Sequence, residues 1–143
     1  MAPTADPTRH PYMIGVAGGS CSGKTTVAER LAELAGDQRV SLIKLDSYYR
    51  TFPERPIEER AKADYDHPDA FDWDLLADHV DQLSMGQAVP VPVYDYTHHL
   101  RSDEVRIVSP TRIVVVEGIL VLADAALRDR FDLKVFIDTE ADL

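Results

Sequence analysis

The sequence predicts a three-layer α/β fold in which helices cover a mostly parallel sheet. Two patterns favour this fold. Short apolar segments alternate with segments of helical periodicity, which is typical of consecutive strand–helix–strand units. A glycine-rich loop directly follows the first apolar segment, and in parallel sheets such loops lie at the edge where ligands bind. The 143 residues, 45% hydrophobic and 28% charged, suffice for one domain with a substantial core.

The first half of the chain contains two predicted strands and one helix. Tyr12–Ala17 is an apolar run followed by glycine, which indicates a buried strand. Residues 23–34 carry apolar side chains at helical spacing before a glycine and predict a helix. Residues 40–45 predict the second strand, and a short helix is expected after Pro56.

The second half continues the alternation and adds a hairpin. Apolar side chains share one face of a predicted helix at Trp73–Met85, and His79 on this helix is expected at the surface. Val89–Tyr94 and Glu104–Val108 predict a hairpin-like excursion. The remaining predicted elements are a strand at 113–116, a short helix at 124–130 and a strand at 133–137.

Composition limits the classes of partner. The formal net charge of −10 disfavours a nucleic-acid binder. No apolar run approaches the length of a membrane span, so a membrane partner is not expected. Cys21 is the only cysteine, which predicts a cytoplasmic protein without internal disulfides. Residues 1–11 contain three prolines and predict a flexible leader ahead of a core at 12–143.

The glycine-rich loop matches G-x-x-x-x-G-K-[ST], the P-loop motif of nucleotide-binding proteins. It lies between a predicted strand and a predicted helix, where backbone N–H groups curl around phosphate oxygens. The motif predicts a P-loop NTPase fold, with Lys24 on the β/γ-phosphates and the Thr25 hydroxyl on Mg²⁺. Cys21 is expected to be a small loop residue. The predicted nucleotide-binding residues are Gly18, Gly19, Ser20, Cys21, Ser22, Gly23, Lys24, Thr25 and Thr26.

Two carboxylates follow predicted strands and therefore belong at the same sheet edge. Asp46 could accept a proton from an incoming hydroxyl or help to hold Mg²⁺, and the alternative is an N-cap of the following turn. Glu117 could bind the metal directly or through water, and the alternative is a structural ion pair. No guanine-specific N-K-x-D pattern occurs, which disfavours a GTPase switch.

Two polar segments suit a ligand with a ring and hydroxyl groups. Residues 64–72 and 93–101 combine acids, aromatic residues, histidines and an arginine, Arg101. For each segment alone, a solvated loop with anchoring tyrosines is an equal alternative. The histidines lack the spacing of a zinc site.

The motifs together resemble the uridine–cytidine kinases of the phosphoribulokinase/uridine kinase family. The resemblance covers residues 12–142 and favours a nucleoside over ribulose phosphate or pantothenate as substrate. It is carried in order by GGSCSGKTT, LDSYY, YDHPDAFD, VPVYDYTHHLR, VVEGIL and VFIDTEADL.

The resemblance implies transfer of the γ-phosphoryl of ATP or GTP to the 5′-hydroxyl of uridine or cytidine, with Mg²⁺. Asp46 matches the catalytic aspartate, with Lys24 on the phosphates, and Glu117 matches the acid near the metal. Asp66 matches the ribose-binding acid, with Tyr49 nearby. The remaining predicted substrate residues are Tyr94 and His99 at the pyrimidine, Tyr65 and Tyr96 beside the nucleoside, and Arg101 in the same motif.

Family members ordinarily continue into an arginine-rich lid helix and a further strand, which do not follow Leu143. Lid arginines stabilise the transferring charge, so we expect impaired activity from this chain. The alternatives are a nucleotide-binding module without turnover and another small-molecule kinase of the same group. The resemblance also implies a homo-oligomer.

Overall fold

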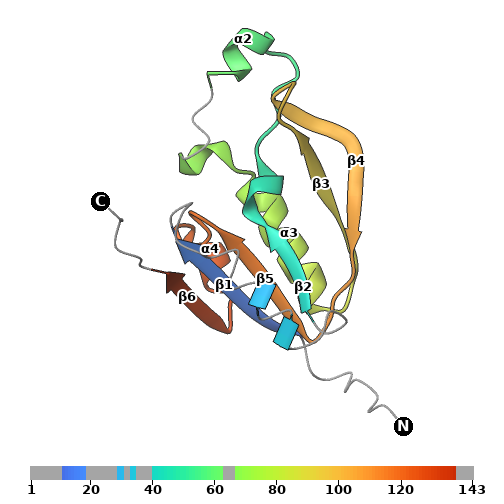
Figure 1. Ribbon diagram of the computed structural model, residues 1–143, viewed down its shortest axis with the longest axis vertical. Helices are drawn as coiled ribbons and strands as arrows, with labels where there is room; N and C mark the ends of the chain where they lie inside the picture. The colour runs from blue at the N-terminus through green and yellow to red at the C-terminus, as the bar shows by residue number, and fades with distance from the viewer. Residues whose placement is uncertain (1–10, 19–28, 31–32, 35–39, 63–66, 138–143) are drawn as a thin grey trace.

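A four-stranded parallel sheet forms the base of the molecule. The computed structural model describes residues 11–18, 29–30, 33–34, 40–62 and 67–137. The strands lie in the order β2-β5-β1-β6, and their connections place chain neighbours apart in the sheet (Figure 1). Their bounds are β1 Tyr12–Gly18, β2 Val40–Lys44, β5 Ile113–Gly118 and β6 Leu133–Ile137.

The two central strands explain why the sequence shows unbroken apolar runs. Every residue of β1 after Tyr12 is buried, and so is every residue of β5 after Ile113. Strands covered on both faces show no alternation of polar and apolar side chains. This confirms the predicted buried strands and the mostly parallel sheet.

The long helix α3, Trp73–Ser84, confirms the helix predicted from apolar periodicity. Leu76, Val80 and Leu83 are each at most 1% exposed, and Gly86 follows the helix with φ of +86°. The prediction of a surface His79 is wrong. Its side chain is 4% exposed, because its Nδ1 is paired with the Tyr48 hydroxyl at 2.8 Å.

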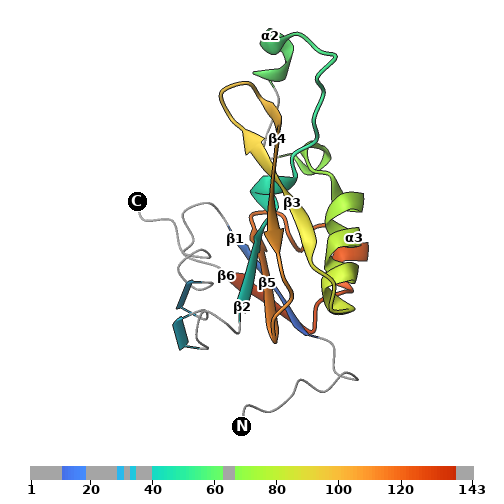
Figure 2. The same cartoon turned by 90° about the vertical axis from the view of Figure 1, so that its right-hand side faces the viewer.

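A two-stranded antiparallel sheet stands beside the end of the parallel sheet, next to α3 (Figures 1 and 2). Its strands are β3, Val89–Asp95, and β4, Leu100–Val108. The hairpin was predicted, but β4 begins four residues earlier than the predicted 104–108. The register shifts between Pro92 and Tyr94, which pair with Val105 and Arg101 respectively.

Short helices complete the described fold. The expected helix after Pro56 is α2, Ile57–Arg60, and the one predicted at 124–130 is the shorter α4, Ala125–Arg128. Two 3₁₀ turns lie on either side of α2 in the sequence: η2 (Leu45–Tyr48) and η3 (Pro68–Ala70). Of the helix predicted at 23–34, residues 29–30 and 33–34 are helical, and the others lie outside the described residues.

One apolar core joins the sheet, α3 and the hairpin. Residues from all three parts belong to a single buried cluster, and among them are Met13, Ile43, Tyr48, Leu76, Val80, Val91, Tyr94 and Val116. The hairpin is therefore packed onto the body of the protein through its valines. None of the described helices is both long enough and apolar enough to cross a membrane.

Candidate functional site

Three predicted features meet at the carboxyl edge of the parallel sheet. Gly18 ends β1, Lys44 ends β2, and Glu117 lies opposite both neighbouring strands, in register with Val16 and Lys44. Asp46 follows β2 within two residues. In open parallel sheets this edge is where ligands bind, and the topology predicted from the sequence is therefore confirmed.

Asp46 lies in the first turn of η2 with an exposed side chain. The Tyr49 hydroxyl donates to its Oδ1 at 3.5 Å, and the Tyr96 hydroxyl donates to its backbone oxygen at 3.3 Å. The alternative role of Asp46 as an N-cap is wrong, because Lys44 occupies that position and no side chain caps the turn. The carboxylate thus remains available to a ligand.

Buried neighbours of Asp46 in the chain fix its position. Leu45 and Tyr48 are fully buried. Gly118 at the end of β5 permits the close approach of Leu45, because a Cβ built on it would lie 2.4 Å from the Leu45 Cβ. The bond between Tyr48 and His79 joins the same turn to α3.

Burial shifts the pKa values of Tyr48 and His79. Desolvation raises the pKa of Tyr48 far above its ordinary value, although Arg106 and Arg101 oppose the shift. Desolvation also lowers the pKa of His79, with Asp78 opposing. Both groups are therefore held neutral near pH 7, and a neutral phenol can donate its proton to the imidazole nitrogen.

Aromatic side chains form a cluster beside Asp46, which Tyr49 and Tyr96 contact directly. The Tyr49 ring lies 5.2 Å from Tyr94 and 6.3 Å from Tyr96, and the last two rings are 5.0 Å apart, measured between centroids. Tyr49 also stacks on Phe71 at 4.8 Å. Tyr96 is 56% exposed, whereas Tyr94 is 9% exposed. The structure therefore brings together Asp46 and three tyrosines that the sequence predicted to bind substrate.

A cavity of about 500 Å³ opens beside this cluster. Its volume lies within the usual range for small-molecule sites. Ser47, Tyr94 and Tyr96 line it together with two cations that sequence reasoning missed, Lys44 and Arg106. Arg106 also donates to the backbone oxygen of Leu42 at 3.3 Å, so the hairpin and β2, which both line the cavity, are joined there.

Arg101 is placed differently from a freely available substrate ligand. Its Nη2 forms an ion pair with Asp72 Oδ2 at 3.0 Å. Sequence reasoning did not assign a role to Asp72, although an aspartate three residues before Leu75 at a helix start is a recognisable N-cap signal. The same carboxylate accepts from the backbone N–H of Leu75 at 3.1 Å.

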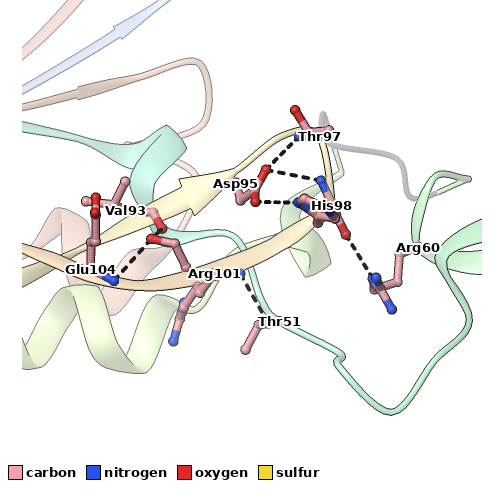
Figure 3. A network of polar contacts seen from close by, with 9 residues as sticks. Thr51, Arg60, Val93, Asp95, Thr97, His98, Arg101 and Glu104 are labelled. Carbon is pink, nitrogen blue, oxygen red and sulfur yellow. Dashed lines mark hydrogen bonds and ion pairs between the residues drawn. The ribbon is translucent and has the colours of Figure 1, made fainter.

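The tip of the hairpin carries His99, which the sequence predicted at the pyrimidine. His99 has φ of +53°, and its side chain is partly buried. Next to it, Asp95 Oδ2 contacts His98 Nδ1 at 2.6 Å, and its Oδ1 accepts from two backbone N–H groups (Figure 3). Hydrogen bonds from His98 lower the pKa of Asp95. The tip is therefore an ordered turn.

Glu117 is buried, with 5% of its surface exposed. A carboxylate oxygen is a ligand type that Mg²⁺ prefers, and protein magnesium sites often supply only one or two carboxylates beside substrate phosphates. The position of Glu117 at the carboxyl edge of the sheet fits that role. Among the described residues no group of three or more His, Cys, Asp or Glu could hold a metal.

Ten predicted site residues lie outside the described residues. They are the phosphate-loop residues Gly19, Ser20, Cys21, Ser22, Gly23, Lys24, Thr25 and Thr26, and the substrate residues Tyr65 and Asp66. Their roles remain predictions from the sequence.

The sequence of this chain matches one family model over residues 13–143, that of the phosphoribulokinase/uridine kinase family. The chain belongs to this family. The match covers the sheet, the hairpin and the Asp46 turn described above. The family resemblance of the sequence motifs is thereby confirmed, and the structure has the P-loop kinase fold expected of a member.

Curated family members that the chain resembles include three uridine kinases. The identity is 46% over 132 residues with that of Halobacterium salinarum, 47% over 135 with that of Halalkalibacterium halodurans and 48% over 133 with that of Deinococcus deserti. These alignments cover 92–94% of this chain. The chain spans 58% of the first relative and 64% of the other two, less than two thirds of their length.

Solved structures agree on the fold. A structure described as a possible uridine kinase from Bacillus stearothermophilus matches with a TM-score of 0.69 at 24% identity, over 95% of this chain and 75% of that one. D-glycerate 3-kinase from Cryptococcus neoformans matches with a TM-score of 0.52 at 21% identity, over 78% of this chain and 44% of that one. At these identities the likeness concerns the kinase fold alone.

Proposed function

We propose that this chain carries the core of a nucleoside kinase that phosphorylates the 5′-hydroxyl of uridine or cytidine with ATP or GTP. The observation that carries the proposal is the exposed Asp46 carboxylate, with Tyr49 and Tyr96 bonded to its residue, near a cavity that Tyr94 and Tyr96 help to line at the carboxyl edge of the sheet. Family membership and the similarity to three uridine kinases support the substrate class.

Asp46 is assigned the role of general base. A carboxylate beside the attacking hydroxyl orients it and accepts its proton as the bond to phosphorus forms. Tyr49 limits the rotation of that carboxylate through its hydrogen bond to Oδ1. Since η2 is buried on its other side through Leu45 and Tyr48, the carboxylate is fixed before the substrate arrives, which reduces the entropic cost of reaction.

The tyrosines form the surface for the nucleoside. Tyr94 and Tyr96 present aromatic rings to the cavity, and such rings suit a planar base. His99, Tyr65 and Asp66 complete the proposed set, with Asp66 on the ribose hydroxyls. Arg101 belongs to this set through its motif, and its ion pair with Asp72 favours an indirect contribution.

The donor nucleotide is assigned to the phosphate loop, residues 18–26. Lys24 would neutralise the β- and γ-phosphates, and Thr25 and Glu117 would hold Mg²⁺, directly or through water. The metal, when bound, offsets phosphate charge during transfer. This assignment rests on the motif G-G-S-C-S-G-K-T and on the buried carboxylate at the end of β5.

The test is a panel of nucleosides with labelled ATP, together with calorimetric titration of uridine and of Mg-ATP. We expect transfer to uridine or cytidine and not to purine nucleosides. Asp46→Asn should lower the rate by about 10²- to 10⁴-fold while Mg-ATP affinity is kept. Asp103→Asn, an exposed aspartate of the hairpin, is the matched control and should change neither.

Two results would contradict the assignment. An unchanged rate in Asp46→Asn would remove Asp46 as the base. A folded chain that binds Mg-ATP but neither binds nor phosphorylates any pyrimidine nucleoside would support a nucleotide-binding module instead.

We also place the reaction in the cytoplasm, where nucleotide donors are abundant. The single cysteine is consistent with that location. A homo-oligomer follows from the family resemblance alone, and analytical ultracentrifugation would test it.

A further inference from the structure

Asp72 joins three parts of the site. Its Oδ1 accepts from the N–H of Leu75 and caps α3, while its Oδ2 pairs with Arg101 of β4. Its own backbone N–H donates to the carbonyl oxygen of Tyr48 in η2 at 2.7 Å. A single residue therefore contacts the long helix, the hairpin and the turn that carries Asp46.

Residues 70–72 form several further contacts with the end of the Asp46 turn and the residues directly after it. The Arg50 N–H donates to Ala70 O at 2.8 Å, and the Arg50 side chain donates through Nε to Phe71 O at 3.1 Å. Tyr49 forms a bridge with Phe71 and stacks on its ring. These bonds join residues 70–71 to the residues that directly follow the Asp46 turn.

On the hairpin side, Arg101 lies directly opposite Tyr94 in the strand register. Its backbone N–H donates to Thr51 Oγ1 at 3.3 Å, as Figure 3 shows, so both its main chain and its side chain are bound to the body of the protein. The Arg101 side chain is 21% exposed, and its Nε is buried without an acceptor among the described residues. A partly buried cation of this kind depends on its carboxylate partner.

We propose that Asp72 is a positioning residue that, through Arg101 on β4, holds the hairpin in its place relative to Asp46, with Tyr94 on β3 and Tyr96 in the turn that follows it. Arg101 then contributes to substrate binding by fixing the tyrosines. The link to catalysis rests on the proposed function, because it assumes that these tyrosines bind the nucleoside. The link between helix and hairpin does not depend on it.

Hydrogen–deuterium exchange of the whole chain without ligand tests the link directly. Asp72→Asn removes the charge but keeps a side chain that caps helices well. Arg101→Gln removes the cation and leaves the cap untouched. Each variant should raise the exchange rate of hairpin amides at 94–101 roughly fivefold. An increase of this size is expected when one partly exposed ion pair no longer stabilises the hairpin. Amides of α3 should keep their protection from exchange. The double variant should show the same hairpin exchange rates as either single variant.

The ion pair between Asp81 and Arg130 is a matched control. It lies on the same helix, with Arg130 Nε at 2.8 Å from Asp81 Oδ1, and joins α3 to the segment after α4 without contacting the hairpin. Asp81→Asn should leave the exchange of residues 94–101 unchanged. Hairpin exchange that is unchanged in both Asp72→Asn and Arg101→Gln would overturn the proposal, as would effects that simply add in the double variant.

Calorimetry separates this proposal from the proposed function. Arg101→Gln should weaken uridine binding about fivefold and leave Mg-ATP binding unchanged. Uridine binding that is unaltered while hairpin exchange rises would overturn the positioning role. If the unaltered chain binds no pyrimidine nucleoside, the proposed function fails, and the exchange experiment still decides whether Asp72 holds the hairpin.

Discussion

Tyr48 and His79 form a buried polar pair immediately below the Asp46 turn. The two side chains are 0% and 4% exposed, and their rings meet edge to face with centroids 5.6 Å apart. Neither group could be buried alone without losing its hydrogen bonds to water. The pair therefore fixes both the turn and the helix, because each supplies the only described partner for the other's buried polar atom.

Replacing Tyr48 with phenylalanine should lower the free energy of unfolding by about 1–3 kcal/mol, because His79 Nδ1 is left buried without a partner. The double variant Tyr48→Phe/His79→Leu should lose less than the two single variants together, since no buried polar atom remains. Urea denaturation measures these values. Tyr12→Phe removes the same atom from a side chain that is 46% exposed, and a loss as large there would contradict the explanation.

The lowered pKa of His79 predicts a pH dependence of stability. The unfolded chain gains a proton on this imidazole as the pH falls below its ordinary pKa of 6.5, whereas the folded chain gains it only at lower pH. The free energy of unfolding should therefore be flat above this value and fall below it, by at most about 1.4 kcal/mol per pH unit. Denaturation between about pH 7.5 and about pH 5.5 measures the slope, and a His79→Leu variant with the same slope would exclude His79 as its source.

Among the elements, the contact between β5 and η2 determines where the Asp46 turn lies. Gly118→Ala would place a Cβ within 2.4 Å of the Leu45 Cβ, and such overpacking usually costs about 1–3 kcal/mol. We expect this loss in urea denaturation together with weaker nucleoside binding, because the turn must shift. Gly86→Ala is the control. Nothing lies within 4 Å of its Cβ position, although its φ of +86° is strained for alanine. It should lower stability and leave nucleoside binding intact.

The elements that could be predicted from the sequence are those whose signals are local. The central strands were recognisable because burial on both faces demands a continuous apolar run, and α3 because Leu76, Val80 and Leu83 repeat at helical spacing. The grouping of Asp46 with Glu117 followed from the topology of parallel sheets. The early start of β4 was missed, since Arg101, Ser102 and Asp103 carry no apolar pattern.

Contacts between distant residues could not be predicted. The burial of His79 depends on its contact with Tyr48. Because Tyr48 is 31 residues away in the chain, no local sequence pattern indicates that burial. The ion pair of Arg101 with Asp72 likewise joins residues 29 apart in the chain, whereas the role of Arg101 at the substrate stays a prediction. The presence of Lys44 and Arg106 at the cavity could not be predicted either, because these residues are far apart in the chain and meet only when the hairpin is folded against β2.

At the scale of the whole molecule, the proposed function requires a strongly acidic chain to bind an acidic ligand. With a net charge of −10, we expect the affinity for a nucleotide to come from local groups: Lys24, the amides of the phosphate loop and Mg²⁺. Mg-ATP at about 100 times its dissociation constant should raise the free energy of unfolding by about 2.7 kcal/mol. Thermal denaturation with and without Mg-ATP measures the gain.

Lys24→Ala should abolish that gain. Arg128→Ala, which removes an exposed cation bonded to Leu122 O, should preserve it. A stabilisation by Mg-ATP that persists in Lys24→Ala would place the nucleotide elsewhere on the protein.

The shift in register within the hairpin has a consequence for how this kinase core could diversify. On β3, Val89, Val91, Pro92 and Tyr94 are buried, so the alternation of buried and exposed residues breaks at Pro92, where the register shifts. Opposite this point, four residue steps of β4 span two of β3. Extra residues can be gained or lost at this irregular stretch while the valines stay anchored. Under the proposed function, such changes would alter the surface offered to the nucleobase without altering the buried valines of β3.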